Sequence, residues 1–267
     1  MSAVDLMFQQ LRAAGRKALI PFVTAGDPDL AFTRALVQEL DARGCHLCEL
    51  GIPYSDPIAD GPVIQASYTR ALNRKVKLDQ ILEMARGVAP TVRLPLVTMV
   101  SYAIIYRHGL ERYVADAKAS GIAGAIVPDL LVDEAGSLAE LCRKEDFSLI
   151  QLVTPTTPRE RALRIAEQSS GFLYYVSVTG ITGERTQLPP DLVDNVAWLR
   201  ERTPLPLCIG FGISQPEHVS LLRQVADGLI VGSALMRRVA QTESQSPEQV
   251  IRGIGDYAAS LLAALNP

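Results

Sequence analysis

The sequence has no excess of basic residues and no long hydrophobic run. Its 26 Lys and Arg are outnumbered by 29 Asp and Glu, which gives a formal net charge of −3, and the basic residues are scattered along the 267 positions. This charge distribution argues against nucleic acid and anionic membranes as partners. No apolar run reaches the roughly 18 residues that span a bilayer, and residues 1–17 lack the pattern of a signal peptide. We therefore expect a cytoplasmic protein.

Cysteine and histidine are scarce, at four and three residues. Cys45 and Cys48 form a Cys-x-x-Cys pattern, which is found in zinc and redox sites. The segment 45–51 is predicted to be a strand, whereas a redox pair normally begins a helix, and no second Cys/His pair has zinc spacing. We expect structural or incidental roles for all the cysteines, and no metal site.

Short apolar runs alternate with longer amphipathic stretches along the whole chain. Parallel strands buried on both faces have this appearance. Eight strands and eight helices, at about 33 residues per unit, predict a single (β/α)₈ barrel domain over 1–267, in the α/β class. An open doubly wound sheet is the alternative, but its usual GxGxxG motif is missing after the first strand. The predicted strands are 18–26, 46–51, 95–100, 122–127, 147–153, 172–178, 205–210 and 227–232.

Local signals place the helices between these strands. Asp27-Pro28 is predicted to begin a helix that ends at Gly44, and Ser214 to Glu217 fits a capping box. Thr157-Pro158 and Pro190 mark further helix starts. An additional amphipathic helix is expected at the amino terminus, with Leu6, Phe8 and Leu11 available for packing. The segment 182–191 is predicted to be a loop on the catalytic face and a candidate lid.

A carboxylate ends the second predicted strand. Active sites of such barrels lie at the carboxyl ends of the strands, where Glu49 is followed by a loop that carries Asp56 and Asp60 between prolines. Burial is costly for a carboxylate and raises its pKa, which suits proton exchange near neutral pH. The alternative is a structural acid at Glu49, with aspartates that only form turns or caps.

Glycine turns follow the last strands, at Thr182-Gly183, Gly210-Phe211-Gly212 and Gly232-Ser233. Glycine lets backbone N–H groups approach an anion closely, and the last two units of these barrels often bind phosphate. The alternative is that these glycines merely end strands. None of the five lysines ends a strand, which argues against a Schiff-base aldolase. A phosphorylated substrate handled by acid–base chemistry is the interpretation that remains.

The residues from Cys48 to Gly61, CELGIPYSDPIADG, closely resemble the signature of the tryptophan synthase α chain family. Further matches are PFVTAGDP (21–28), IVPDL (126–130), YVSVTGITG (175–183), GFGIS (210–214) and ADGLIVGSAL (226–235), so the resemblance covers the whole length. It implies cleavage of indole-3-glycerol phosphate to indole and glyceraldehyde 3-phosphate by a retro-aldol reaction.

The resemblance also implies roles for individual residues. Glu49 matches the main acid–base residue, and Asp60 matches the aspartate that accepts the indole N–H. Tyr174 matches an active-site tyrosine, and Phe22 an aromatic residue that packs on indole. Phosphate-binding positions are matched by Gly183, Gly212, Gly232 and Ser233, with Phe211 in the same turn; Thr182 matches a lid threonine.

The family implies a partner, a pyridoxal-phosphate-dependent β subunit in an αββα assembly that receives indole through a tunnel. This chain shows no sign of a cofactor site of its own. Ala103-Ile104 and Leu131 depart from the common residues of loops that face the β subunit in the family. We hypothesise that partner contacts or inter-subunit signalling are altered here.

Three other functions are compatible with parts of the pattern. Indole-glycerol phosphate synthase would need a strand-end lysine. A catalytically weak activator of a β subunit would have no need for Glu49, Asp60 and Tyr174 together. A stand-alone lyase that releases free indole stays open because of the changed interface positions.

Overall fold

The computed structural model describes residues 1–57, 60–176, 190–210 and 212–267. Within these ranges, nine parallel strands form one sheet in the order β5-β4-β3-β2-β1-β9-β8-β7-β6. The edge strands β5 (Ser148–Ile150) and β6 (Leu152–Val153) are consecutive in the chain and are separated only by Gln151. The two edges of the sheet therefore meet, and the sheet is a barrel rather than the open alternative.

The other strands match the predicted apolar runs closely, with bounds a few residues shorter. All seven residues of β1 are buried, as expected of a parallel strand covered on both faces. The one difference in number is the predicted run 147–153, which is divided at Gln151. The strands are β1 (Ala18–Thr24), β2 (Cys48–Gly51), β3 (Leu96–Met99), β4 (Ile122–Ile126), β7 (Leu173–Val176), β8 (Leu207–Gly210) and β9 (Gly228–Val231).

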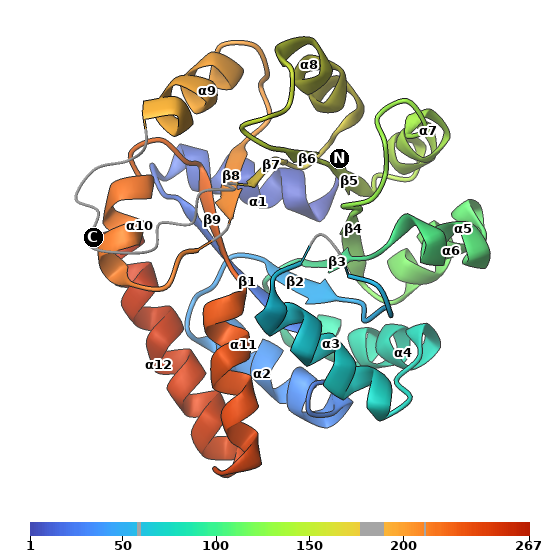
Figure 1. The fold of residues 1–267 in the computed structure, drawn as a ribbon, viewed down its shortest axis with the longest axis vertical. Coiled ribbons are helices and arrows are strands. Elements are labelled where there is room, and N and C mark those ends of the chain that lie inside the picture. Colours follow the sequence, from blue (N-terminus) through green and yellow to red (C-terminus); the bar gives the residue numbers. More distant parts are fainter. Residues whose placement is uncertain (58–59, 177–189, 211) are drawn as a thin grey trace.

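Helices surround the strands (Figure 1). Three of the eight units carry two helices instead of the predicted one, so that the described residues hold twelve α-helices with the amino-terminal helix included. They are α1 (Ala3–Ala13), α2 (Leu30–Ala42), α3 (Pro62–Asn73), α4 (Leu78–Val88), α5 (Tyr102–His108), α6 (Leu110–Ala119), α7 (Gly136–Lys144), α8 (Arg159–Gln168), α9 (Pro190–Arg200), α10 (Pro216–Leu222), α11 (Ser233–Val239) and α12 (Pro247–Leu265).

Three predicted helix starts are wrong in detail, and one of them is that of α8, whose cap is Pro158 and not Thr157. The cap of α2 is Asp29, whose carboxylate accepts the N–H of Phe32 at 2.7 Å, and not Asp27. Asp27 is instead buried and accepts two hydrogen bonds from Arg70. The expected capping box at 214–217 does not form, because the cap of α10 is Gln215 and its side chain makes no capping hydrogen bond. Gly44 follows the end of α2 in the left-handed region, as predicted.

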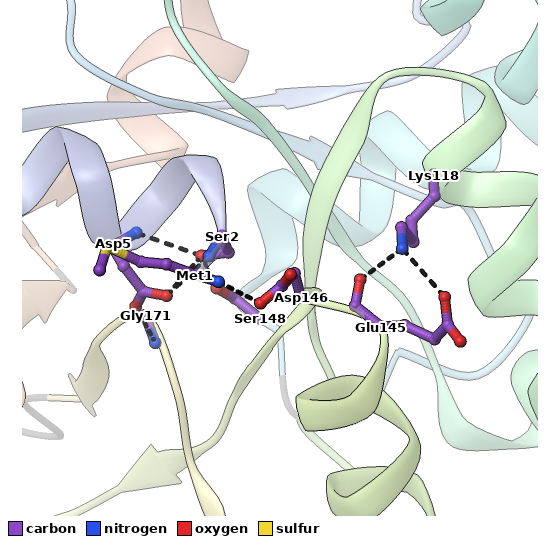
Figure 2. A network of polar contacts seen from close by, with 8 residues as sticks. All are labelled: Met1, Ser2, Asp5, Lys118, Glu145, Asp146, Ser148 and Gly171. Atoms are coloured by element: carbon purple, nitrogen blue, oxygen red, sulfur yellow. Dashed lines mark hydrogen bonds and ion pairs between the residues drawn. The ribbon is translucent and has the colours of Figure 1, made fainter.

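The amino-terminal helix α1 covers the amino ends of two strands (Figure 2). Ser2 Oγ lies 2.7 Å from the hydroxyl of Ser148 at the start of β5, and Asp5 accepts the N–H of Gly171 just before β7. Phe8 and Leu11 are buried as expected, whereas Leu6 is 47% exposed. Figure 2 also shows the neighbouring ion pair of Lys118 with Glu145. Helix α1 therefore packs at the amino ends of the strands, opposite the carboxyl ends where the sequence predicts a site.

No helix in the described ranges is both long enough and apolar enough to cross a membrane. The four cysteines are buried and free, as expected of structural residues. The predicted lid over 182–191 falls outside the described residues up to position 189, and its last two residues belong to the first turn of α9.

Candidate active site

A cavity of about 340 Å³ lies among residues that follow or end the strands, which is within the usual size range of small-molecule sites. Seven of the predicted site residues line it, although they come from five different units of the chain. Thr182, Gly183 and Phe211 lie outside the described residues. The predicted residues in the lining are Phe22, Glu49, Asp60, Tyr174, Gly212, Gly232 and Ser233.

Glu49 is completely buried on β2, directly opposite Phe22 of β1 in the strand register. Neither carboxylate oxygen has a hydrogen-bond partner among the described residues. Burial raises the pKa of Glu49 to about 8, and the negative charge of Asp60 adds to the shift. A structural acid would be hydrogen-bonded within the fold, so this geometry favours the acid–base interpretation.

Asp60 enters the cavity from the loop after β2. Its backbone is held on both sides, because its N–H donates to the Pro57 carbonyl at 3.0 Å and its carbonyl accepts from Gln65 Nε2 at 2.8 Å. The Oδ2 atom is buried with no partner among the described residues. Burial raises the pKa of Asp60 to about 6. Asp56, by contrast, is exposed, does not line the cavity and accepts a hydrogen bond from Ser55.

Tyr174 and Phe22 form aromatic walls of the cavity. Burial, together with the charges of Glu49 and Asp60, raises the pKa of Tyr174 well above its usual range, so the hydroxyl stays protonated. The ring lies against Gly210, where an added β-carbon would come within 2.9 Å of Tyr174 Cε1. Glycine at position 210 therefore has a specific steric reason, which is to leave room for the tyrosine.

The glycine turns of the last two units bring small residues and one cation to the cavity. Gly212 has a φ of 75°, in the left-handed region that favours glycine, and Gly232 and Ser233 begin α11. Arg237, also in the lining, was not predicted. It follows Ser233 by four residues on the same helix, and this i,i+4 spacing, which puts both side chains on one face, was the available signal. Backbone N–H groups, a hydroxyl and a guanidinium together suit a phosphate group.

The predicted interface positions lie near each other, but not all of them lie in loops. Ala103 and Ile104 belong to the first turn of α5, not to a loop, because Ser101 caps that helix. Asp129 accepts hydrogen bonds from Ser101 Oγ at 2.6 Å and from the Tyr102 N–H at 2.7 Å, which ties α5 to the segment after β4. Leu131 in that segment is 52% exposed and Tyr106 on α5 is 71% exposed.

Metal ligands do not gather in the described residues, where no group of three His, Cys, Asp or Glu side chains is placed to hold an ion. Fold and cavity together define a (β/α)₈-barrel protein with a small-molecule site at the carboxyl ends of its strands. The carboxyl groups of Glu49 and Asp60 line this site, and the groups at the turns of the last two units suit a phosphate.

Comparisons with known proteins give the family. The family model described as tryptophan synthase alpha chain matches residues 8–264. The tryptophan synthase alpha chain of Rhodopirellula baltica is 55% identical, covering 100% of this chain and 99% of that protein, and that of Rippkaea orientalis is 45% identical, covering 99% and 98%. The chain therefore belongs to the tryptophan synthase alpha chain family.

Solved structures agree with this assignment. The alpha subunit of Legionella pneumophila superposes with a TM-score of 0.90 at 33% identity, covering 99% of this chain and 98% of that one. A chain of the tryptophan synthase α2β2 complex of Pyrococcus furiosus gives 0.86 at 37% identity, covering 93% and 99%. The family, the barrel fold and the lyase class predicted from the sequence are thus confirmed.

Proposed function

We propose that this chain cleaves indole-3-glycerol phosphate into indole and D-glyceraldehyde 3-phosphate. The observation that carries the proposal is the pair Glu49 and Asp60 in one cavity, both with raised pKa values, at about 8 and about 6. Groups that titrate near the working pH are the ones that transfer protons efficiently. A cavity of about 340 Å³ accommodates a substrate of this size.

The reaction needs one proton to move from the side-chain hydroxyl of the substrate to carbon 3 of its indole ring. Protonation of carbon 3 leaves positive charge on the ring nitrogen, beside which we place the Asp60 carboxylate as acceptor of the N–H. Glu49 gives that proton and takes the hydroxyl proton. The carbon–carbon bond then breaks, its electrons return to the ring, and the oxygen forms the aldehyde. Glu49 ends in its starting protonation state, so no co-reactant is consumed.

Other residues hold the two ends of the substrate. Phe22 packs on the indole ring and Tyr174 forms the wall opposite. The phosphate lies at the turns that contain Gly183, Gly212, Gly232 and Ser233, with Phe211 beside them and Thr182 ordering the lid. This arrangement is supported by the cavity lining for the described members of the set and by the family resemblance for the others.

A partner subunit completes the proposed activity. The Pyrococcus furiosus relative is described in an α2β2 complex with mutual activation. We place a β subunit of the same kind on this chain in an αββα assembly, with pyridoxal phosphate held by the partner and no cofactor in this chain. The exposed Leu131 and Tyr106 near α5 offer an apolar contact surface. We further propose that the whole chain, 1–267, acts as one domain in the cytoplasm.

The direct test measures indole released from indole-3-glycerol phosphate by the purified chain, with and without the cognate β subunit. Weak activity alone with strong stimulation by β would support the α-subunit function. High activity without β would favour the second candidate, a stand-alone lyase, for which the departures at Ala103, Ile104 and Leu131 are the motivating observation. Absence of activity under both conditions would contradict the proposal. Ordinary tight association with mutual activation would contradict the altered-interface hypothesis.

A further inference from the structure

Tyr68 is a fully buried tyrosine whose hydroxyl has no hydrogen-bond partner among the described residues. It lies on α3, the helix that begins directly after Asp60 and Gly61. Folded proteins rarely leave a buried hydroxyl unpaired, so such a group calls for an explanation. The position was not singled out by any sequence pattern, because a tyrosine on the buried side of an amphipathic helix looks like an ordinary core residue.

The Tyr68 hydroxyl lies at the inner wall of the barrel. A β-carbon added to Gly51 would lie 2.9 Å from Tyr68 Oη and 2.7 Å from Phe22 Cε2. Gly51 follows Glu49 by two residues on β2, so both positions face the same side of the strand. The Tyr68 ring packs at centroid distances of 6.5 Å from Phe22 and 5.6 Å from Tyr54. The hydroxyl is therefore fixed by packing beside the strand that carries the buried glutamate.

Unpaired acceptors lie nearby. Both oxygens of Glu49 and the Oδ2 atom of Asp60 are buried without partners among the described residues. Besides burial, the negative charge of Asp60, then Tyr54 and then Glu49, raises the pKa of Tyr68, so the hydroxyl keeps its proton and is available as a donor. Tyr174 faces the same carboxylates from β7, and Arg237 lines the cavity from α11.

We propose that Tyr68 is a positioning residue, whose hydroxyl donates a hydrogen bond to the Asp60 carboxylate when substrate fills the cavity. The inference rests on the proposed function, in which ionised Asp60 accepts the indole N–H. The Tyr68 ring is held by its neighbours and the Asp60 backbone by hydrogen bonds to Pro57 and Gln65, so the Asp60 carboxylate adjusts by rotation of its side chain. The bond favours the ionised form of Asp60 and directs its free oxygen at the ring nitrogen.

The test uses binding instead of turnover. Glu49→Gln is placed in every protein compared, so that Asp60 is the one carboxyl of the proposed catalytic pair that titrates. The probe is indole-3-propanol phosphate, which lacks the side-chain hydroxyls and is not cleaved. Its Kd is measured by calorimetry between pH 5 and 8.5, with and without Tyr68→Phe. The phosphate of the probe titrates identically in both proteins, so its effect cancels in the ratio of the two Kd values.

Above pH 8 we expect the Kd of the Tyr68→Phe protein to be about ten-fold higher than that of its parent, as for loss of a hydrogen bond to a charged group. The ratio shrinks several-fold as the pH falls below 6 and Asp60 becomes neutral. A ratio of one at all pH values, or a ratio that does not change with pH, would overturn the assignment. Failure of the probe to bind the parent protein would contradict the proposed function, and the inference with it.

Tyr113→Phe is the matched control. Tyr113 is also fully buried, but its hydroxyl is paired with Thr98 Oγ1 at 2.7 Å and does not line the cavity. Its replacement should lower the Tm and leave the Kd ratio at one. Tyr68→Phe removes a hydroxyl that has no partner in the part of the chain that the structure describes, and it should leave the Tm of the empty protein unchanged or raised. A Tm loss in Tyr68→Phe as large as that in Tyr113→Phe would indicate a structural role and would also overturn the assignment.

Discussion

Replacing Glu49 by glutamine should stabilise the fold, and increasingly so as the pH rises. The pKa of Glu49 is about 8 in the folded state against 4.5 as the ordinary value. Between these values the folded chain holds one proton more than the unfolded chain, so raising the pH favours unfolding. The cost of ionising Glu49 is absent below pH 4.5 and fully present above pH 8. Glutamine carries no charge and avoids that cost.

The magnitude follows from the width of this interval. Each pKa unit corresponds to about 1.4 kcal/mol, so the ionisable side chain lowers the free energy of unfolding by about 3 kcal/mol at pH 7 and about 5 kcal/mol above pH 8. For a chain of this size 1 kcal/mol changes the Tm by roughly 2–4 °C. Glu49→Gln should therefore raise the Tm on the order of 10 °C at pH 8.5 and by little at pH 5.

Thermal unfolding followed by circular dichroism at pH 5, 7 and 8.5 measures this difference. Glu140→Gln, on an exposed position of α7, is the matched control and should change the Tm equally little at each pH. A Tm difference for Glu49→Gln that stays constant across this pH range would refute the reasoning. It would mean that the buried carboxylate is compensated in the folded state.

Two further predictions concern the cavity walls. Arg237→Gln should raise the KM for the phosphorylated substrate about ten-fold with kcat nearly unchanged. The control Arg238→Gln should leave the KM unchanged, because the Arg238 guanidinium stacks on Tyr257 at 3.5 Å and donates a hydrogen bond to the Ala234 carbonyl. Equal KM values for Arg237→Gln and the wild type in steady-state assays would exclude Arg237 from the phosphate site. Gly210→Ala should push Tyr174 out of place, which lowers the free energy of unfolding by about 1–3 kcal/mol and weakens substrate binding. The control Gly253→Ala, with open space around it in α12, should stabilise the fold by up to about 1 kcal/mol. Denaturation midpoints that shift equally in the two variants would show that the clash with Tyr174 is relieved elsewhere.

The sequence predicts the barrel well because its strands are buried on both faces. A continuous apolar run such as 18–26 has few ways to be buried other than as a strand covered on both faces. The division of the run 147–153 into two strands at Gln151 was not predictable, because a polar residue inside an apolar run does not by itself divide a strand. Asp27 was misassigned as a helix cap for a related reason. The true cap Asp29 is two residues away, and the pairing of Asp27 with Arg70 spans 43 positions.

The site is predicted where its chemistry is local and missed where it depends on packing. Glu49 and Asp60 stand in one distinctive segment, so their residue types and order indicate the site. Arg237 and Tyr68 are each on a helix. The i,i+4 spacing from Ser233 was a signal for Arg237, but only the fold shows that Arg237 lines the cavity and that the Tyr68 hydroxyl has no hydrogen-bond partner among the described residues. Side-chain direction on a helix follows from its packing, which no single sequence window contains.

The most direct test of the catalytic account is the rate of indole release by Glu49→Gln relative to the wild type, each saturated with the β subunit and with indole-3-glycerol phosphate. Loss of a general acid–base group predicts a decrease of roughly 10²- to 10⁴-fold, with the protein still folded and still binding the propanol analogue. A rate within a few-fold of the wild type would contradict the central claim that the buried carboxyl group of Glu49 transfers the protons of this reaction.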